Sequence, residues 1–402
     1  MAQHRTSLPI AIIGAGIGGL VLALSLRARG FEAELFEQSS ELAEIGAAVA
    51  LSANATRELE RLGLLSGLAA LSTEPEELIW RDGLTGRRVA AHPVRKGSAY
   101  VRHFGAPYLG IHRASLQKVL SGTHGQNGLN LSHRLTSIAD DGAGVILGFE
   151  NGGTHRAALV IGADGVRSAV RRHVSGKPGY VYSRTSAFRG IVPRSRLASL
   201  PDAESIQFWM GPDAHLLHYA IGGAAEDVNF FAVVEGPAQW PNGDRWIAPA
   251  AAGEALHAFQ GWHPAVTEMI AAGWVDKRWG LFVVQQPARW WRGRVCLIGD
   301  AAHGMLPHQG QGANTTIEDA TVLAELIARL GTGDPGLLFT RFEALRRLRT
   351  RSIQRSSWTT NRLLHLPGVD AATAARDWRM AQFPEHFGWI HAHDALSSVS
   401  AA

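Results

Sequence analysis

Three glycines and one acid near the start of the chain have the types and spacing needed to bind a nucleotide diphosphate. Gly14, Gly16 and Gly19 follow an apolar run, and Glu37 ends the next apolar run 18 residues after Gly19. In such a unit the first glycine makes a tight turn, the second admits a pyrophosphate and the third packs a helix against a strand. The acid then binds the ribose hydroxyls and disfavours a 2′-phosphate. We therefore expect FAD or NAD at this turn rather than NADP.

A second acid, Asp300, stands where another apolar run meets a glycine-rich loop. Gly310 and Gly312 let the backbone approach a flat ligand, and the next helix begins near Ala313 and Asn314. Amides at a helix N-terminus suit a ligand atom that carries negative charge. Because an ordinary strand-to-helix turn has the same pattern, this segment indicates a cofactor site only in combination with the other motifs.

A third acid, Asp164, lies in the sequence Gly-Ala-Asp-Gly at 162–165, after the apolar run 158–161. Aspartate is a preferred N-cap residue, so Asp164 can cap the helix expected over 166–174. It can also face the ligand of the first motif, and the two roles do not exclude each other. Together the three motifs indicate a cradle for a dinucleotide cofactor.

These motifs require a βαβ unit at the start of the chain and further elements that return to it. Hydrophobic period and turn residues predict these elements. The predicted strands are 9–13, 33–36, 129–134, 136–140, 144–149, 158–161 and 279–284, and a small β-layer over the nucleotide half is expected around a hairpin turn at 140–142. The predicted helices are 20–29, 54–61 after a cap at Ser52 or Asn54, one opened by 112–117, 166–174, 250–272 and 337–366.

Between residues 182 and 236 the pattern changes to alternating strands, which predicts an antiparallel sheet. Period-two geometry places alternate residues on one face of each strand: His215, Leu217 and Tyr219 in one, and Ile206, Phe208 and Met210 in its neighbour. An aromatic face with few polar groups suits the roof of a pocket for a ring-shaped substrate. His215 and His218 fit a solvated outer face equally well, whereas Tyr219 and Arg189 are stronger candidates for substrate contact.

Composition excludes several classes of protein. With 402 residues, 46% of them hydrophobic, the chain can bury a large core and form two domains or one elaborate one. The formal net charge of +4 gives no reason to expect nucleic-acid binding, although it suits an anionic substrate. The single cysteine, Cys296, excludes an internal disulfide and lies in an apolar run, as a buried inert thiol does. We expect no metal site. We also expect neither a signal peptide nor a membrane span, and hence a cytoplasmic protein.

GAGIGG at 14–19, GADG at 162–165 and the GD segment at 297–320 together resemble the single-component FAD-dependent aromatic hydroxylases. This family, the group A flavoprotein monooxygenases, includes salicylate hydroxylase, 3-hydroxybenzoate 6-hydroxylase and 6-hydroxynicotinate 3-monooxygenase, and the resemblance extends to about residue 365. It implies an α/β fold: a Rossmann-like FAD-binding domain with an inserted antiparallel β-sheet substrate domain and C-terminal helices. The implied boundaries are 1–180 and 280–345 for the FAD-binding domain, 181–279 for the substrate domain and 346–402 for the helical region.

The resemblance also assigns cofactor contacts. Ala48 and Val49 would run beside the flavin ring, and Asp300 would bind the ribityl hydroxyls. Asp164 would abut the pyrophosphate and help the nicotinamide donor to dock. The full set implied for FAD is Gly14, Gly16, Gly19, Glu37, Ala48, Val49, Arg113, Gln117, Leu135, Asp164, Asp300, Gly310, Gly312, Ala313 and Asn314, in which Arg113 and Gln117 hold the ribityl-phosphate part. The pyridine-hydroxylase branch has a histidine where this chain has Ala50, which argues against that branch.

The sequence has no second GxGxxG unit, so the nicotinamide donor is expected to visit and leave. The resemblance implies that NADH or NADPH reduces FAD, that O2 forms a flavin C4a-hydroperoxide, and that its distal oxygen is transferred to an electron-rich ring of hydroxybenzoate, aminobenzoate, phenol or hydroxypyridine type. His308 is the candidate to orient or deprotonate the substrate with a pKa near neutral, and a loop histidine bonded to backbone is the alternative. The candidate catalytic residues are His308, Tyr219, Arg189 and His215.

Two other functions fit the same motifs. One is an FAD-dependent epoxidase or another tailoring oxidoreductase of a natural-product pathway, and the other is a flavin-binding carrier or sensor without turnover. The expected partners are a small aromatic substrate, O2 and NAD(P)H, with no nucleic acid and no membrane, and the protein would be a monomer or a homodimer. Seven arginines between 341 and 362 are expected on a solvated helix face rather than in an acid-binding site.

Overall fold

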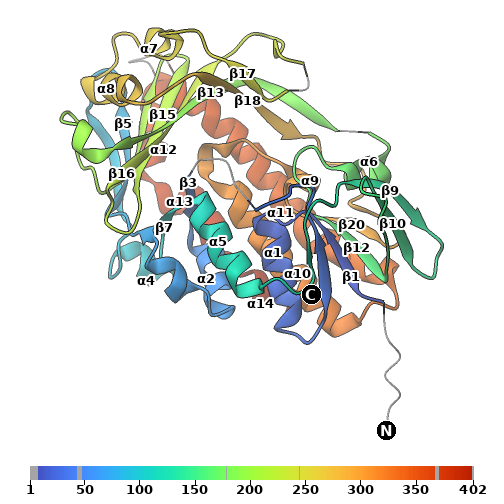
Figure 1. Cartoon of the computed structure of the whole chain (residues 1–402). Helices are drawn as coiled ribbons and strands as arrows, with labels where there is room; N and C mark the ends of the chain where they lie inside the picture. Colours follow the sequence, from blue (N-terminus) through green and yellow to red (C-terminus); the bar gives the residue numbers. More distant parts are fainter. Residues whose placement is uncertain (1–7, 43–47, 178, 244, 367–370, 401–402) are drawn as a thin grey trace.

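The computed structural model describes residues 8–42, 48–177, 179–243, 245–366 and 371–400 (Figure 1). One half of the molecule contains a six-stranded sheet in the order β19-β20-β12-β1-β2-β8, in which only β19 runs antiparallel to its neighbour. Its strands are β1 (Ile10–Ile13), β2 (Ala33–Phe36), β8 (Leu129–Asn130), β12 (Leu159–Gly162), β19 (Trp291–Arg292) and β20 (Val295–Leu297). The expectation that 129–134 joins a separate β-layer is wrong, because β8 extends the parallel sheet beside β2.

Five of the described helices pack around the parallel sheet. They are α1 (Ile17–Arg27), α5 (Arg113–His124), α6 (Ala169–Ser175), α9 (Asp300–His303) and α10 (Gln311–Leu330). Ten of the eleven residues of α1 are buried, because this apolar helix packs against α10 and α5 as well as β2. The expected βαβ unit is therefore confirmed, with its helix fully enclosed.

The other half is built on an eight-stranded sheet in the order β17-β18-β13-β16-β15-β14-β5-β6. Its strands are antiparallel except for the pair β14 and β5. They are β5 (Glu77–Asp82), β6 (Arg88–Pro93), β13 (Tyr180–Pro193), β14 (Ile206–Gly211), β15 (Ala214–Ile221), β16 (Asp227–Glu235), β17 (Ile247–Pro249) and β18 (Lys277–Val284). Phe208 lies opposite Leu217, and Met210 lies opposite His215, so the two predicted strand faces are one face of this sheet.

Two short helices, α7 (Glu254–Ala258) and α8 (Pro264–Ala272), cover the outer face of the large sheet (Figure 1). The single helix expected over 250–272 is wrong. Gly261 has a φ of 81°, and Pro264 opens α8, so the chain cannot continue as one helix through this segment.

Smaller elements complete the fold. The sheet of residues 135–157 packs against the parallel sheet, where Phe149 stacks on Phe36 with ring centroids 4.8 Å apart, so the small β-layer expected over the nucleotide half is present. Two three-stranded sheets consist of β3 (Ala48–Leu51), β7 (Leu109–His112) and β4 (Ser72–Thr73), and of β9 (Leu135–Asp140), β10 (Val145–Phe149) and β11 (Thr154–Ala157). The short helices are α2 (Ala53–Arg61), α3 (Leu65–Ala69) and α4 (Ala99–Phe104), with 3₁₀ turns at Arg194–Arg196 and Pro307–Gln309. The sheet that contains β3 and β7 therefore lies between the cofactor motifs and the large sheet, because β7 also contacts β15.

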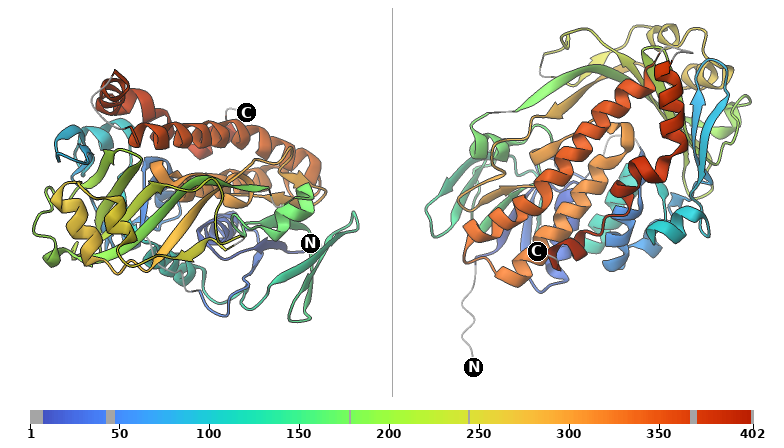
Figure 2. Two further views of the ribbon diagram at one scale, coloured as in Figure 1. Left: turned by 90° about the horizontal axis from the view of Figure 1, so that it is seen from above. Right: turned by 180° about the vertical axis from the view of Figure 1, so that it is seen from behind.

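The long helix α11 (Pro335–Leu364) runs along the back of both halves (Figure 2). It is followed by α12 (Ala371–Ala381), α13 (Phe383–His391) and α14 (Ala395–Ser400). Arg341, Arg351, Arg355 and Arg362 are exposed, as expected for a solvated face. Arg346, however, is completely buried, because α11 is packed against α10 along this stretch. A solvated face was therefore the wrong interpretation for Arg346.

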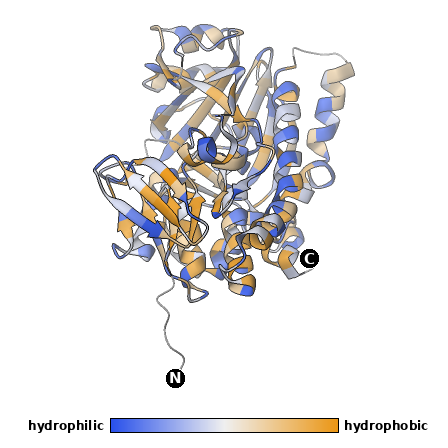
Figure 3. Ribbon diagram, turned by 90° about the vertical axis from the view of Figure 1, so that its right-hand side faces the viewer, coloured by the Kyte–Doolittle hydropathy of each residue, from blue (hydrophilic) through white to orange (hydrophobic). Residues whose placement is uncertain are grey.

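Hydrophobic residues concentrate in the strands of the parallel sheet, whereas the outward turns of the helices are polar (Figure 3). Cys296 is buried in this core, as expected. Among the helices that the structure describes, none is long and apolar enough to cross a bilayer. The large sheet draws β5 and β6 from residues 77–93, so the exact domain boundaries stay a prediction.

Candidate functional site

The first glycine motif forms the turn between β1 and α1. Gly14 has a φ of 103°, and a Cβ at Gly19 would lie 1.9 Å from the carbonyl oxygen of Gly14. Both positions therefore require glycine for backbone reasons alone. By contrast, a Cβ at Gly16 would meet no atom within 4 Å. Gly16 thus faces open space at the helix N-terminus, where a pyrophosphate would lie.

Side chains from two neighbouring elements hold this turn. The carboxylate of Glu37 accepts the N–H of Ala15 at 3.0 Å and the N–H of Ser39 at 3.0 Å. The side chain of Gln117, on α5, donates to the carbonyl oxygen of Ala15 at 3.3 Å. Glu37 is therefore fixed beside the glycine turn at the end of β2, as expected for a ribose-binding acid, and Gln117 positions the turn.

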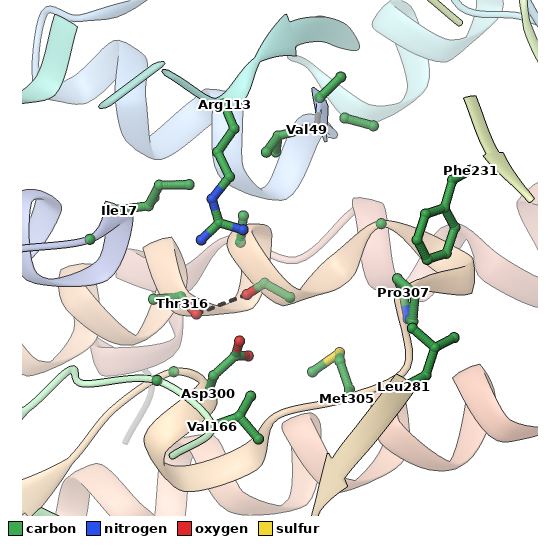
Figure 4. Close-up of a pocket in the computed structure, with 18 of the residues that line it drawn as sticks. Ile17, Val49, Arg113, Val166, Phe231, Leu281, Asp300, Met305, Pro307 and Thr316 are labelled. Atoms are coloured by element: carbon green, nitrogen blue, oxygen red, sulfur yellow. Dashed lines mark hydrogen bonds between the residues drawn. The ribbon is translucent and has the colours of Figure 1, made fainter. Parts of the chain in front are cut away.

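A cavity of about 390 Å³ lies between the parallel-sheet half and the large sheet. Arg113 and Asp300 project from opposite walls into the same space, and Val49, Met305 and Pro307 add apolar surface (Figure 4). The predicted residues that line this cavity are Gly16, Ala48, Val49, Arg113, Arg189, Tyr219, Asp300, Gly310, Gly312 and Ala313. The predicted residues outside its lining are Gly14, Gly19, Glu37, Gln117, Leu135, Asp164, His215, His308 and Asn314.

Asp300 begins α9, and an ion network positions it from behind. The carboxylate of Asp319 accepts the N–H of Gly299 at 2.9 Å and contacts the Nε2 of His303 at 2.6 Å. Arg346 holds Asp319 at 2.7 Å and also pairs with Glu318 at 2.7 Å. Asp300 itself makes no side-chain hydrogen bond to another described residue, and burial raises its pKa. A hydroxyl-bearing ligand would satisfy this carboxylate.

Two other motif residues act within the protein itself. One carboxylate oxygen of Asp164 accepts the N–H groups of Ala169 and Val170, in the first turn of α6, at 2.7 and 3.1 Å. The prediction that Asp164 is the N-cap residue is wrong, because α6 begins at Ala169 and its N-cap is Ser168, whose side chain accepts the N–H of Arg171. The side chain of Asn314 accepts the N–H of Ser52 and donates to the carbonyl oxygens of Ala50 and Gly310. Asn314 therefore ties β3 to the start of α10, and its side chain is not free for a ligand.

The cavity fits a dinucleotide with a flat ring. It begins at the open Gly16 turn, passes the charged pair of Arg113 and Asp300, and ends between β3 and the loop that contains Pro307. A phosphate, a hydroxylated chain and an apolar ring need these environments in this order. FAD has all three parts, so the residues present suit FAD.

Comparison with known proteins decides the family. The model of the FAD binding domain family matches residues 7–356, which is most of the chain. The chain belongs to the FAD-dependent aromatic monooxygenases. A 3-amino-4-hydroxybenzoate 2-monooxygenase of Streptomyces platensis is 37% identical over 391 residues, which cover 96% of each chain. Membership of this family supports FAD as the cofactor.

Solved structures of this monooxygenase family share the fold. A salicylate hydroxylase substrate complex has a TM-score of 0.83 at 28% identity and covers 98% of both chains. HpxO of Klebsiella pneumoniae, complexed with FAD and uric acid, has a TM-score of 0.83 at 25% identity and covers 98% of both chains. The resemblance and the α/β fold predicted from the sequence motifs are confirmed.

On the substrate side of this monooxygenase, Arg189 is a half-buried cation in the cavity wall. Its guanidinium lies 4.5 Å from the ring of Trp279 and 5.0 Å from the ring of Phe231, and its Nε has no hydrogen-bond partner in the part of the chain that the structure describes. No described carboxylate forms an ion pair with it. Burial, with a smaller contribution from Arg113, lowers the pKa of Arg189 to about 10. The group therefore stays charged at neutral pH and lacks a counterion.

The two histidines of β15 are both buried, so the solvated-face alternative is wrong for His215 and His218. They lie on opposite faces of the sheet. The face of His215 is turned toward the site, and α7 and α8 cover the face of His218. His215 contacts His308 on one side at 3.2 Å and His365 on the other at 2.7 Å. The ring nitrogens of His218 make no hydrogen bond to a described residue.

His308 has neither of the two properties expected of it. Its Nδ1 contacts His215 and not the backbone, and its Nε2 is buried without a partner among the described residues. Burial lowers its pKa to about 3, so a value near neutral is wrong. The reason is the lack of an adjacent carboxylate, since both the apolar surroundings and the nearby His365 disfavour a charged ring.

His308 lines a second, smaller cavity of about 40 Å³ under the same face of the large sheet. Trp80 and Phe208 stack there with ring centroids 5.3 Å apart. The C-terminal helices α12 and α13 close it with Met380, Phe383, Phe387, Ile390 and His391. Sequence analysis missed these residues, although the i, i+4 spacing of Phe383 and Phe387 indicates an apolar helix face.

Proposed function

We propose that this protein hydroxylates an aromatic ring that carries a carboxylate together with a hydroxyl or amino group, with FAD, NADH or NADPH, and O2. The observation that carries the proposal is the half-buried guanidinium of Arg189 in the cavity wall, whose Nε is buried and which forms no ion pair with a described carboxylate. A cation that is partly withdrawn from water and has no counterion is destabilised, so a site of this kind favours an anionic ligand. Carboxylate geometry matches guanidinium in a bidentate pair.

The register of the roof suits a single ring with two polar substituents. Arg189, Phe231 and Leu217 are paired across three neighbouring strands, which places the backbones of Arg189 and Leu217 about 10 Å apart. His215 and Tyr219 flank Leu217 on the same face of β15. A ring held at its carboxylate by Arg189 would therefore present its other substituent toward this strand.

Each residue of the site has a distinct proposed role. Arg189, in the wall of the main cavity, binds the substrate carboxylate. Pro307 and Gly310 line the main cavity and His308 and Gln309 line the smaller one, so the ring is placed where the two cavities adjoin at this turn, and the Nε2 of His308 accepts a hydrogen bond from the ring hydroxyl there. The hydroxyl of Tyr219 makes no hydrogen bond to another described residue and is proposed to orient the ring. Leu217, Phe231 and other apolar residues exclude water. The redox chemistry, which is hydride acceptance and activation of dioxygen, is supplied by FAD when it is bound.

Similarity to the Streptomyces platensis enzyme supports an aminohydroxybenzoate as the first substrate to test. The experiment measures aerobic NADH and NADPH oxidation by the FAD-loaded protein with 3-amino-4-hydroxybenzoate, salicylate, 3-hydroxybenzoate, 6-hydroxynicotinate and 2-aminophenol. We expect the benzoates to stimulate oxidation and to yield a product heavier by one oxygen atom. 2-Aminophenol, which lacks the carboxylate, is the matched control and should stimulate much less.

Substitution of Arg189 separates carboxylate binding from the rest of the site. Arg189→Gln should raise KM for the benzoate by about 10- to 100-fold and leave the response to 2-aminophenol unchanged, because a charge-assisted hydrogen bond is worth about 1.5–3 kcal/mol. Equal stimulation by 2-aminophenol and the benzoate would contradict carboxylate recognition. Retention of FAD that neither nicotinamide reduces would contradict the monooxygenase and indicate a carrier or sensor.

A further inference from the structure

We propose that His365 and Glu235 form the outer end of a proton path that connects the substrate site to solvent through His308 and His215. The inference rests on the proposed function, in which a ring hydroxyl meets His308. Neither His365 nor Glu235 belongs to a cofactor motif. His365 follows the last residue of the long helix α11, and Glu235 ends β16.

Four side chains form an unbroken series of contacts. The Nδ1 of His308 lies 3.2 Å from the Nε2 of His215, whose Nδ1 lies 2.7 Å from the Nε2 of His365. The Nδ1 of His365 lies 2.5 Å from a carboxylate oxygen of Glu235. Each ring thus uses its Nδ1 toward the surface and its Nε2 toward the site.

The carboxylate of Glu235 determines which nitrogen of each imidazole in the series carries the proton. An ionised Glu235 can only accept, so His365 must donate through Nδ1–H and keep a lone pair on Nε2. His215 must then donate to that lone pair through its own Nδ1–H, and His308 must do the same toward His215. The result is a lone pair on the Nε2 of His308, which is buried without a partner and faces the smaller cavity.

Only one end of the series reaches water. His308 and His215 are 3% and 1% exposed, and the side chain of His365 is 5% exposed. The side chain of Glu235 is 45% exposed. A proton that enters at His308 therefore has no shorter hydrogen-bonded route among the described side chains than the one that ends at Glu235.

A path explains how a buried imidazole can serve a proton transfer. An isolated imidazolium at His308 would lack a nearby carboxylate and would be costly in this apolar site. In the series, His308 need not store the proton, because it passes its Nδ1 proton outward as it receives one on Nε2. Burial lowers the pKa of His215 as well, which keeps both inner rings neutral between transfers.

The transfer balances one proton in and one proton out. The ring hydroxyl loses its proton to the Nε2 of His308, and the Nδ1 proton of each ring moves to the next acceptor until Glu235 is protonated. Glu235 then releases its proton to water. The reverse transfer, which protonates the product phenolate before release, restores the original Nδ1–H forms.

The first test measures proton release. FAD-loaded protein in weak buffer with phenol red is mixed rapidly with 3-amino-4-hydroxybenzoate, and flavin absorbance reports binding in the same experiment. Glu235→Gln keeps an acceptor for His365 but cannot carry the proton, so we expect normal binding and proton release slowed at least about 10-fold. Glu226→Gln, which alters an exposed carboxylate just before β16, is the control and should behave as wild type. Acetate should restore fast release to Glu235→Ala.

The second test needs no substrate. In protein labelled with ¹⁵N-histidine, His308, His215 and His365 should each be neutral and protonated at Nδ1, with assignments from His308→Gln, His215→Gln and His365→Gln. Any of the three found protonated at Nε2 in the substrate-free protein would overturn the path. Fast proton release by Glu235→Gln with intact binding would overturn it too. Failure of every benzoate to bind wild type would instead refute the proposed function, and the NMR result would still decide the path.

Discussion

The cofactor side and the substrate side of the main cavity are built by different means. On the cofactor side, polar groups follow strand ends within short motifs, as Gly16 follows β1 and Asp300 follows β20. On the substrate side, the polar contacts join residues that are distant in sequence, and His215 and His365 are 150 residues apart. The comparison teaches that backbone geometry places the cofactor groups, whereas tertiary packing alone places the substrate groups.

The largest effect is expected where the cofactor side depends on one buried cation. Arg346→Met removes the charge that joins Glu318 and Asp319, both completely buried, and should lower the free energy of unfolding by about 3–5 kcal/mol. It should also reduce FAD content, because Asp319 holds the turn before Asp300. Denaturant unfolding and released FAD measure both effects. Arg351→Met, exposed on the same helix, is the control, and equal stability of the two variants would refute the role of the network.

This network also shows where sequence analysis stops. The positions of Gly14 and Asp300 follow from local spacing, and so do most strands and helices of the parallel-sheet half. Arg346 sits in a run of arginines that looks solvated, and nothing local shows that α10 covers it. The residue types at 215 and 308 indicated chemistry, but their contact with each other and with His365 depends on how α11 crosses the large sheet.

Asp300→Ala tests the cofactor side directly. Its carboxylate lies in the cavity without a hydrogen-bond partner among the described side chains, so loss of the bonds proposed to the ribityl hydroxyls should weaken FAD binding by about 3 kcal/mol. Titration of the apoprotein with FAD measures the change. A variant that retains FAD and full turnover would remove the role assigned to Asp300.

Glu37→Ala should have a somewhat smaller effect on the same side. Loss of the ribose hydrogen bonds should weaken FAD binding by about 1.5–3 kcal/mol, although the turn at Ala15 also loses an acceptor. Glu41→Ala, which alters an exposed carboxylate near the same strand, serves as the control. Unchanged affinity of the Glu37 variant, measured by FAD titration, would contradict the ribose assignment.

The smallest effect is expected from His218, which lies on the face of β15 opposite to His215. Burial lowers the pKa of His218 to about 3, below its unfolded value of about 6.5, so the unfolded state binds more protons between these values. The contribution of His218 to stability is therefore complete above about pH 6.5. Below that value the free energy of unfolding falls by about 1.4 kcal/mol for each unit by which the pH is lowered, from this one residue. His218→Leu should lessen that slope without affecting turnover. An unchanged slope in unfolding experiments at pH 5 and 7 would contradict the assignment.

The most direct test of the whole account is the product formed per NAD(P)H consumed, with peroxide release measured beside it. Wild type with 3-amino-4-hydroxybenzoate should give nearly one product per NAD(P)H and should take its new oxygen from ¹⁸O2. His308→Ala and Tyr219→Phe should keep their FAD and their substrate-free NAD(P)H oxidation, yet lose product in favour of hydrogen peroxide. His308→Ala removes the general base, which typically costs about 10²–10⁴-fold, and Tyr219→Phe removes the hydroxyl that orients the ring. If both variants keep wild-type coupling and product yield, the substrate side does not activate the ring and the account is wrong.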